Sequence, residues 1–207
     1  MPEIGRSFRL KLLLVAAVAC AMEALFLLPA SVFVPATFVA TGVMVVCAWK
    51  GGAIRRRPVP SVASLLLGAA SAAVLYLVFL GGNAGISAFP SLGLKASSEA
   101  SIYSLVSSPS DPRYLELVLL MFDAVGYETF FRGFLQRELK PRMGLGAAPA
   151  VALFDAALHI ATLNPLWVAT TFVADLCWGL TYHAKGLASS TASHFIWDVA
   201  VFILFPI

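Results

Sequence analysis

Six side chains capable of acid–base or electrostatic chemistry fall into three pairs along the chain. The members of each pair are four positions apart, which places them on one face of a helix. Carboxylates and imidazoles together provide a general base and an electrophile, the two groups needed for attack of water on a carbonyl. The three pairs are Glu128 with Arg132, Asp155 with His159, and His194 with Asp198. They predict one polar pocket where three helices meet. Spacing alone leaves open a plainer interpretation, in which each pair only joins neighbouring helices by hydrogen bonds.

The rest of the chain is strongly apolar. Hydrophobic residues make up 60% of the 207 positions and charged residues 12%, whereas an ordinary globular protein is about one quarter charged. An ionisable group inside lipid costs about 2.5–3.5 kcal/mol on insertion scales, so its position is informative. The first three predicted spans contain one such group, Glu23, and all three pairs come later. We therefore expect the functional site in the C-terminal half, at about residues 114–207.

The apolar runs predict an all-α fold, a polytopic transmembrane bundle of about seven helices in one domain, residues 1–207. The predicted spans are Leu12–Ala30, Val32–Trp49, Val62–Leu80, Tyr114–Phe131, Ala147–Leu163, Leu166–His183 and Ala192–Pro206. The segment Gly81–Pro112, rich in Gly, Ser and Pro, is predicted to be an outer loop. In the third span, Gly68, Ser71 and Ala72 are small enough to let helices approach closely.

Basic residues cluster after the second and fourth predicted spans, at Arg55–Arg57 and Arg137–Arg142. By the positive-inside rule these two loops are expected in the cytoplasm. The net charge of +3 is too small and too scattered to indicate a nucleic-acid partner. Three cysteines lie inside apolar runs, which predicts small buried side chains without a disulfide framework: Cys20, Cys47 and Cys177.

Three motifs in order carry a resemblance to a known family. The run Tyr127-Glu-Thr-Phe-Phe-Arg-Gly resembles the motif EExxxR, commonly followed by Gly, of the CPBP family, which comprises CAAX proteases and bacteriocin-processing enzymes. The helix ending at His159 resembles the second motif of that family. The run from Trp178 to Asp198 resembles the third, in which a Gly-containing helix leads to HxxxN or HxxxD. The resemblance covers roughly residues 114–202.

This resemblance implies a glutamic-type intramembrane endopeptidase. No cofactor is expected, and no metal is expected because the sequence lacks a zinc-binding motif. Glu128 and His159 would activate water, and His194 with Asp198 would stabilise the oxyanion. Arg132 would pair with Glu128 and keep it ionised. The implied partners are the lipid bilayer and a membrane-anchored protein or peptide substrate. The Ala-rich chain has a bacterial character, which suggests a multi-pass protein of the bacterial inner membrane that acts on a precursor or a C-terminal sorting tail.

Three positions depart from the family pattern. Tyr127 replaces the first Glu of the motif, which is usually assigned as catalytic. Asp155 stands where an aromatic residue precedes the second-motif His, and we hypothesise that it provides the missing carboxylate and shares a water molecule with Glu128 and His159; it could also merely orient His159. Asp198 stands where Asn is common, so it would act as a protonated donor or fix the tautomer of His194.

Rival functions remain possible on this sequence. A catalytically inactive CPBP-like immunity or scaffold protein is compatible with Tyr127. A transporter would also use intramembrane carboxylates and histidines, but neither an inverted repeat nor Gly/Pro-broken helix pairs are evident. A zinc peptidase would need ligands such as His159 and His194, yet the motif H-E-x-x-H is absent. Asp123, Asp175 and His183 are expected to be packing or helix-end residues.

Overall fold

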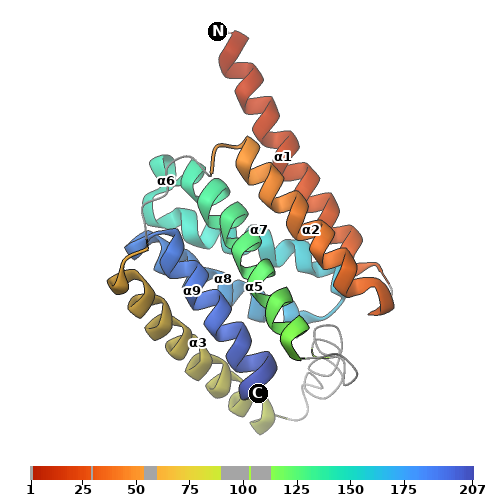
Figure 1. Ribbon diagram of the computed structural model, residues 1–207, viewed down its shortest axis with the longest axis vertical. Helices are drawn as coiled ribbons and strands as arrows, with labels where there is room; N and C mark the ends of the chain where they lie inside the picture. The colour runs from red at the N-terminus through yellow and green to blue at the C-terminus, as the bar shows by residue number, and fades with distance from the viewer. Residues whose placement is uncertain (1, 29, 54–59, 90–102, 104–112) are drawn as a thin grey trace.

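The computed structural model describes residues 2–28, 30–53, 60–89, 103 and 113–207, and all regular structure in these ranges is helical. The predicted all-α fold is therefore confirmed. Figure 1 shows the helices gathered into a bundle from which the N-terminal helix projects. The α-helices are α1 (Pro2–Phe26), α2 (Ala30–Lys50), α3 (Val62–Ala88), α5 (Arg113–Phe130), α6 (Arg137–Met143), α7 (Ala147–Leu158), α8 (Pro165–Lys185) and α9 (Leu187–Asp198).

In the described part of the chain, two π-helical segments interrupt the regular helices. The first, Phe131–Gln136, joins α5 to α6, and the second, Val199–Leu204, continues α9. Short 3₁₀ turns, Gly144–Gly146 and His159–Thr162, flank α7. π-helical segments are rare and often lie at functional sites. Here the first overlaps the Glu128–Arg132 pair and the second begins directly after Asp198.

Within the residues that the structure describes, four helical stretches are long and apolar enough to cross a membrane: Val32–Lys50, Val62–Ala88, Tyr114–Thr162 and Leu187–Leu204. The chain is an integral membrane protein, but the seven predicted spans are not confirmed. The fifth of them shows one reason. The twelve residues of α7 rise about 18 Å, which is shorter than a hydrocarbon core of about 30 Å. The long third stretch instead runs from α5 through the first π segment, α6 and α7.

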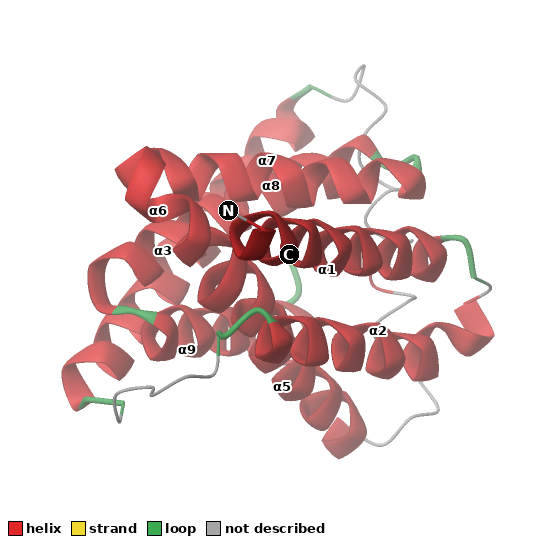
Figure 2. Ribbon diagram, turned by 90° about the horizontal axis from the view of Figure 1, so that it is seen from above, coloured by secondary structure: helices red, strands yellow, loops and turns green. Residues whose placement is uncertain are grey.

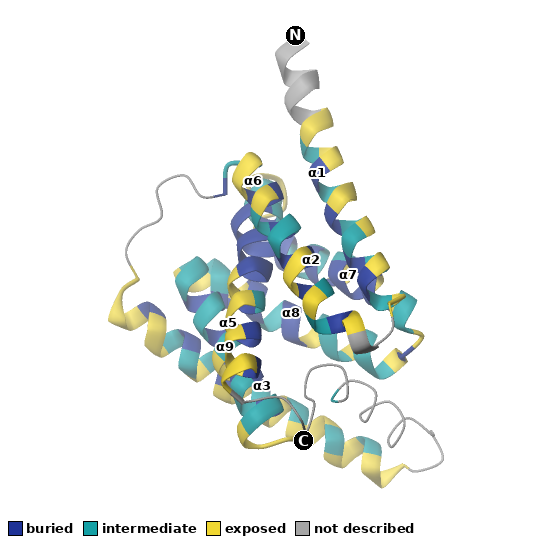
Figure 3. Cartoon of the chain, turned by 45° about the vertical axis from the view of Figure 1, so that its right-hand side comes forward, coloured by how far each residue is buried: buried dark blue, intermediate teal, exposed yellow. Residues whose placement is uncertain are grey.

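The burial pattern of α3 is that of a helix in lipid. Its buried side is formed by small or polar residues such as Ser64 and Ala72, while Leu66 and Leu77 are about two-thirds exposed. Figure 3 shows that exposed positions dominate α3, whereas buried positions gather in the centre of the bundle. In water this arrangement would expose the apolar leucine side chains to solvent. In a bilayer it places them against acyl chains.

The small residues of α3 allow close packing, as expected. A Cβ atom added to Gly68 would lie 2.6 Å from the backbone oxygen of Ser189 on α9, so a larger side chain would force the helices apart. One turn further, the hydroxyls of Ser71 and Thr181 are 2.6 Å apart and connect α3 to α8. Ala72 is buried in an apolar cluster with Trp178 and Trp197.

The predicted end of the third span at Leu80 was wrong, because α3 continues to Ala88. Glycines at 81, 82 and 85 suggested a loop, since Gly disfavours helices in water. In a low-water environment the backbone groups need partners within the helix, which outweighs that preference. Phe89 follows the last helical residue and precedes Pro90 in the sequence, and a residue before proline is disfavoured in the α conformation.

The helices pack so that α5 contacts α2 on one side and α9 on the other. Helix α9 in turn packs on α3 and α8, α7 packs on α8, and α1 packs on α2. Figure 2, viewed from above, shows α7 and α8 on one side, α2 and α5 on the opposite side, and α1 between them. The three helices that carry the polar pairs therefore surround a common interior.

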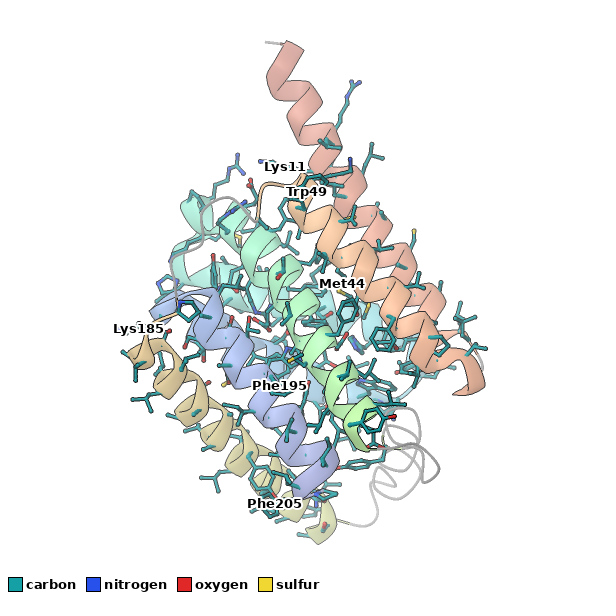
Figure 4. The ribbon with its side chains drawn as sticks, viewed as in Figure 1. Lys11, Met44, Trp49, Lys185, Phe195 and Phe205 are labelled. Atoms are coloured by element: carbon teal, nitrogen blue, oxygen red, sulfur yellow. The ribbon has the colours of Figure 1, made fainter. Side chains whose placement is uncertain are left out.

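One end of the bundle carries basic groups. Lys11 forms an ion pair with Glu138 at 2.6 Å, and Arg137 donates to the carbonyl oxygen of Gly52 at 2.9 Å. Figure 4 shows Lys11 and Trp49 at this end and Phe205 at the opposite end. The Arg55–Arg57 cluster lies outside the described residues. Of the three cysteines that were expected to be buried, Cys47 is buried, Cys177 is partly buried and Cys20 is exposed.

Candidate active site

A cavity of about 190 Å³ lies in the interior of the bundle, with room for several water molecules. Most of its wall is apolar and comes from α1, α2, α5 and α8. Its titratable wall residues come from α5, from the turn after α7, and from α9: Asp123, Tyr127, His159, His194 and Asp198. Two of the three predicted pairs therefore contribute to one cavity, through His159 and through His194 with Asp198.

His194 is held on the cavity wall by contacts at both ring nitrogens and at one face of its ring. Its Nδ1 lies 3.1 Å from Oε1 of Glu128, and its Nε2 lies 3.4 Å from Oδ2 of Asp198. Since an ionised carboxylate only accepts hydrogen bonds, Nδ1 must carry the hydrogen in its contact with Glu128. The ring is stacked on Trp178, with 3.7 Å between ring centroids and 12° between planes. Position and tautomer of His194 are thus both constrained.

Arg132 is completely buried and holds two carboxylates. Its Nη2 donates to Oδ1 of Asp175 at 2.5 Å and to the backbone oxygen of the same residue at 3.0 Å, and its Nη1 donates to Oδ2 at 3.3 Å. Its Nε lies 3.6 Å from Oε2 of Glu128. The predicted pairing with Glu128 is present, but the closer partner is Asp175. A buried guanidinium with such geometry recovers much of the free energy of desolvation.

Asp155 is also completely buried, and its Oδ2 accepts a hydrogen bond from the hydroxyl of Tyr127. Its other oxygen has no hydrogen-bond partner in the described part of the chain. Asp155 is not among the residues that line the cavity. Tyr127, which replaces the first carboxylate of the motif, therefore stands between Asp155 and the cavity.

His159 begins the 3₁₀ turn after α7 and faces the cavity. Its Nδ1 lies 3.0 Å from the backbone oxygen of Asp155. A carbonyl oxygen only accepts, so Nδ1 carries the hydrogen, and in the neutral ring Nε2 keeps a lone pair. The ring also contacts Phe26 of α1 at 4.7 Å and Trp167 of α8 at 5.8 Å between centroids. The turn thus places Nε2 of His159, a hydrogen-bond acceptor, at the cavity wall among apolar side chains.

The observed grouping differs from the expected one. Glu128 was assigned to His159, but its carboxylate contacts His194 and Arg132, and Glu128 does not line the cavity. The expected trio of Asp155, Glu128 and His159 around one water is therefore not assembled by direct contacts. Instead, Asp155 contacts His159 mainly through its backbone oxygen. Asp198 and His194 are adjacent, as their spacing predicted.

Sequence reasoning missed three members of this network, because it treated them as packing or as a mere replacement. Asp175 is the main partner of Arg132, Tyr127 is the donor to Asp155, and Asp123 lines the cavity and accepts a hydrogen bond from Thr41 at 2.9 Å. One signal was available. Asp123 precedes Tyr127 by four residues, so the two lie on the same helix face.

Residues 109–200 match the model of one protein family, the type II CAAX prenyl endopeptidase Rce1-like family. We refer to residues 109–200, which are similar to this family, as the Rce1-like segment. The match confirms the resemblance to CAAX proteases that the three motifs predicted, and it supports a membrane protein of the CAAX protease type. No curated protein and no solved structure matches the chain significantly.

The Rce1-like segment contains every titratable residue of the cavity wall, together with Glu128, Arg132, Asp155 and Asp175. Helices α1 and α2 lie outside it, yet they close one side of the cavity. They contribute Phe26, which contacts the ring of His159, and Thr41, which donates to Asp123. The polar groups thus belong to the Rce1-like segment, and part of their surround comes from the preceding helices.

Proposed function

We propose that this chain is an intramembrane endopeptidase that hydrolyses a peptide bond in a membrane-anchored protein or in its C-terminal tail. The observation that carries the proposal is the convergence of two histidines, His159 and His194, on one cavity inside an apolar bundle. Burying polar groups within lipid is costly. Here specific hydrogen bonds at Nδ1 set the tautomers of both histidines. Such preorganisation is what catalysis of acyl transfer to water requires.

The roles of the two histidines follow from their contacts. With Nδ1 held by the carbonyl of Asp155, His159 presents Nε2 to accept a hydrogen bond from the attacking water. His194, placed between Glu128 and Asp198, stabilises the negative charge that develops on the carbonyl oxygen. Glu128 then acts through His194 as a positioning residue, and Arg132 with Asp175 holds Glu128 in place. Asp155 positions His159 and Tyr127. No metal ion and no cofactor enter this scheme.

We place the protein in a bacterial inner membrane, with residues 1–207 as one transmembrane domain. A protein anchored in the same membrane is the fitting substrate class, because the cavity lies inside a bundle whose helices are themselves long and apolar enough to cross that membrane. Prenylated CAAX proteins are largely eukaryotic, so a membrane-anchored precursor or a sorting tail suits this setting better.

The test uses the purified chain in liposomes together with a panel of single-span membrane proteins that carry C-terminal tails. New peptide termini are identified by mass spectrometry. The wild type should cleave, while His159→Ala and His194→Ala should lose nearly all cleavage at matched protein amounts. His183→Ala is the control, because His183 lies in the last turn of α8 and does not line the cavity. Strong chelators should leave cleavage intact, and zinc-reversible loss would indicate a metallopeptidase.

One observation favours a second function, a catalytically inactive immunity or scaffold protein. Tyr127 occupies the position of the first motif carboxylate and binds Asp155, which keeps that carboxylate away from the cavity. Under this alternative no panel member is cleaved by the wild type, and His159→Ala and His194→Ala have the same effect on cells as the wild type.

A further inference from the structure

The motif carboxylate missing at position 127 has a neighbour one helical turn away. Asp123 lies four residues before Tyr127 on α5, and both side chains line the same cavity. A carboxylate at this position reaches the cavity from the same helix face as a residue at 127. Asp123 is also close enough to His159 and His194 to interact electrostatically with both rings.

Asp123 is partly buried, and it differs in how it is engaged from the four buried carboxylates that belong to this network. Glu128 and Asp175 are bound to Arg132, and Asp155 is bound to Tyr127; none of these three lines the cavity. Asp198 lines it but has His194 as an ionic partner at 3.4 Å. Asp123 accepts one hydrogen bond at Oδ1, from Thr41, and no described residue donates to its second oxygen or pairs with it ionically.

We propose that Asp123 is the catalytic carboxylate of this chain, the general base that takes a proton from water in the cavity. This inference rests on the proposed peptidase function. In the first step one O–H bond of the water breaks, the proton goes to Asp123, and the water oxygen bonds to the peptide carbon while the C=O electron pair moves onto oxygen. In the second step the C=O bond re-forms, the C–N bond breaks, and Asp123 returns the proton to the leaving nitrogen.

In this arrangement the water lies between Asp123 and His159. Nε2 of His159 accepts a hydrogen bond from the O–H group that the water keeps. The free oxygen of Asp123 is the proton acceptor, and Thr41 fixes the carboxylate through the oxygen it already occupies. A general base contributes roughly 10²–10⁴-fold to a rate. The role of the missing Glu is thereby moved one turn along α5.

The kinetic test compares Asp123→Asn with two matched variants in the liposome assay. Asp123→Asn keeps the size of the side chain and should lower kcat by about 100-fold or more, with KM and unfolding temperature near those of the wild type. Asp123→Glu keeps the base and should retain more turnover than Asp123→Asn. Thr41→Val removes only the hydrogen bond and should cost less than tenfold. Wild-type turnover in Asp123→Asn would overturn the proposal.

A second measurement does not depend on turnover. In a variant whose three native cysteines are replaced by Ala, Asp123→Cys should react with a small charged thiol reagent, because the proposal requires water at this position. Glu128→Cys, one position behind Tyr127 and off the cavity wall, is the comparison and should react more slowly. Equal or slower labelling at position 123 would contradict the inference.

The outcomes separate the two proposals. If His159→Ala and His194→Ala are inactive while Asp123→Asn is fully active, the peptidase function stands and Asp123 is excluded as its base. If the wild type cleaves no member of the panel, the peptidase function fails and the assignment of Asp123 fails with it. If Asp198→Asn alone loses turnover while Asp123→Asn does not, the base is Asp198.

Discussion

Nδ1 of His194 lies 3.1 Å from Oε1 of Glu128, although 66 residues separate them in the chain. This contact joins the first motif on α5 to the third on α9, and Arg132 extends it to Asp175 on α8. Three helices are therefore fixed relative to one another by buried charges. The charges that orient His194 are also those that hold the bundle together, so variants must be judged by both activity and stability.

Glu128→Gln should lower kcat by at least about tenfold while leaving most of the protein folded. The amide oxygen can still accept from Nδ1 of His194, but the hydrogen bond loses its ionic character, and charged hydrogen bonds are roughly twice as strong as neutral ones. A tenfold change corresponds to about 1.4 kcal/mol of activation free energy. Cleavage rates at matched liposome content measure the effect. An unchanged kcat would remove Glu128 from the mechanism.

Asp175→Asn should destabilise the fold by about 3–5 kcal/mol, because it leaves the buried guanidinium of Arg132 with Glu128 as its remaining anionic partner. The measurement is the unfolding free energy in detergent. Glu138→Gln is the matched control. It removes the anionic partner of Lys11 and Arg137. All three side chains are more than about 30% exposed, so the loss should be at most about 1 kcal/mol. Similar losses in the two variants would show that burial of the Arg132 pair contributes little.

The residues that meet in the bundle interior were more predictable than the way they pair. Helical spacing alone was enough to select Glu128, His159 and His194, since residues four apart share a face in any helix. The choice of Asp175 as the partner of Arg132 was not accessible, because those residues are 43 positions apart and meet only through the packing of α8. Asp123 was undervalued for the same reason, since its role depends on what surrounds it.

The fold was predicted in class and less well in its boundaries. Apolar runs identified α2 and α3 as spans, and the small residues around Gly68 identified a close contact. The number of spans was harder, because a run such as Ala147–Leu163 is apolar without being long enough as a helix to cross. Hydropathy reports how apolar a residue type is. A short helix that is buried among other helices therefore has the same hydropathy as a helix in lipid.

The basic end of the bundle should face the cytoplasm. A single cysteine introduced in place of the exposed Lys140 in α6 should be labelled only after the membrane is made permeable, because basic residues are retained inside. A cysteine in place of Phe89, exposed at the end of α3, should be labelled from outside intact cells. Both variants need a background without native cysteines. The reverse pattern would invert the topology.

Tyr127→Phe should destabilise the protein by about 1–3 kcal/mol, because it leaves the buried carboxylate of Asp155 without its donor. Asp155→Asn should cost less, since the amide oxygen can still accept from Tyr127. If Asp155 only positions its neighbours, its substitution should change kcat little. Asp155→Asn keeps the backbone oxygen that binds His159, so its turnover should stay within about tenfold of the wild type, or about 1.4 kcal/mol.

The double variant Tyr127→Phe/Asp155→Leu distinguishes a shared contact from two independent roles. When both partners are replaced by apolar groups no buried donor or acceptor is left behind, so the loss of unfolding free energy should be smaller than the sum of the two single losses. Additive losses would mean that the hydroxyl and the carboxylate do not depend on each other. A much larger fall in kcat for Asp155→Asn than for Tyr127→Phe would give Asp155 a direct part in activating water, and the role of base would then have to be divided between Asp155 and Asp123.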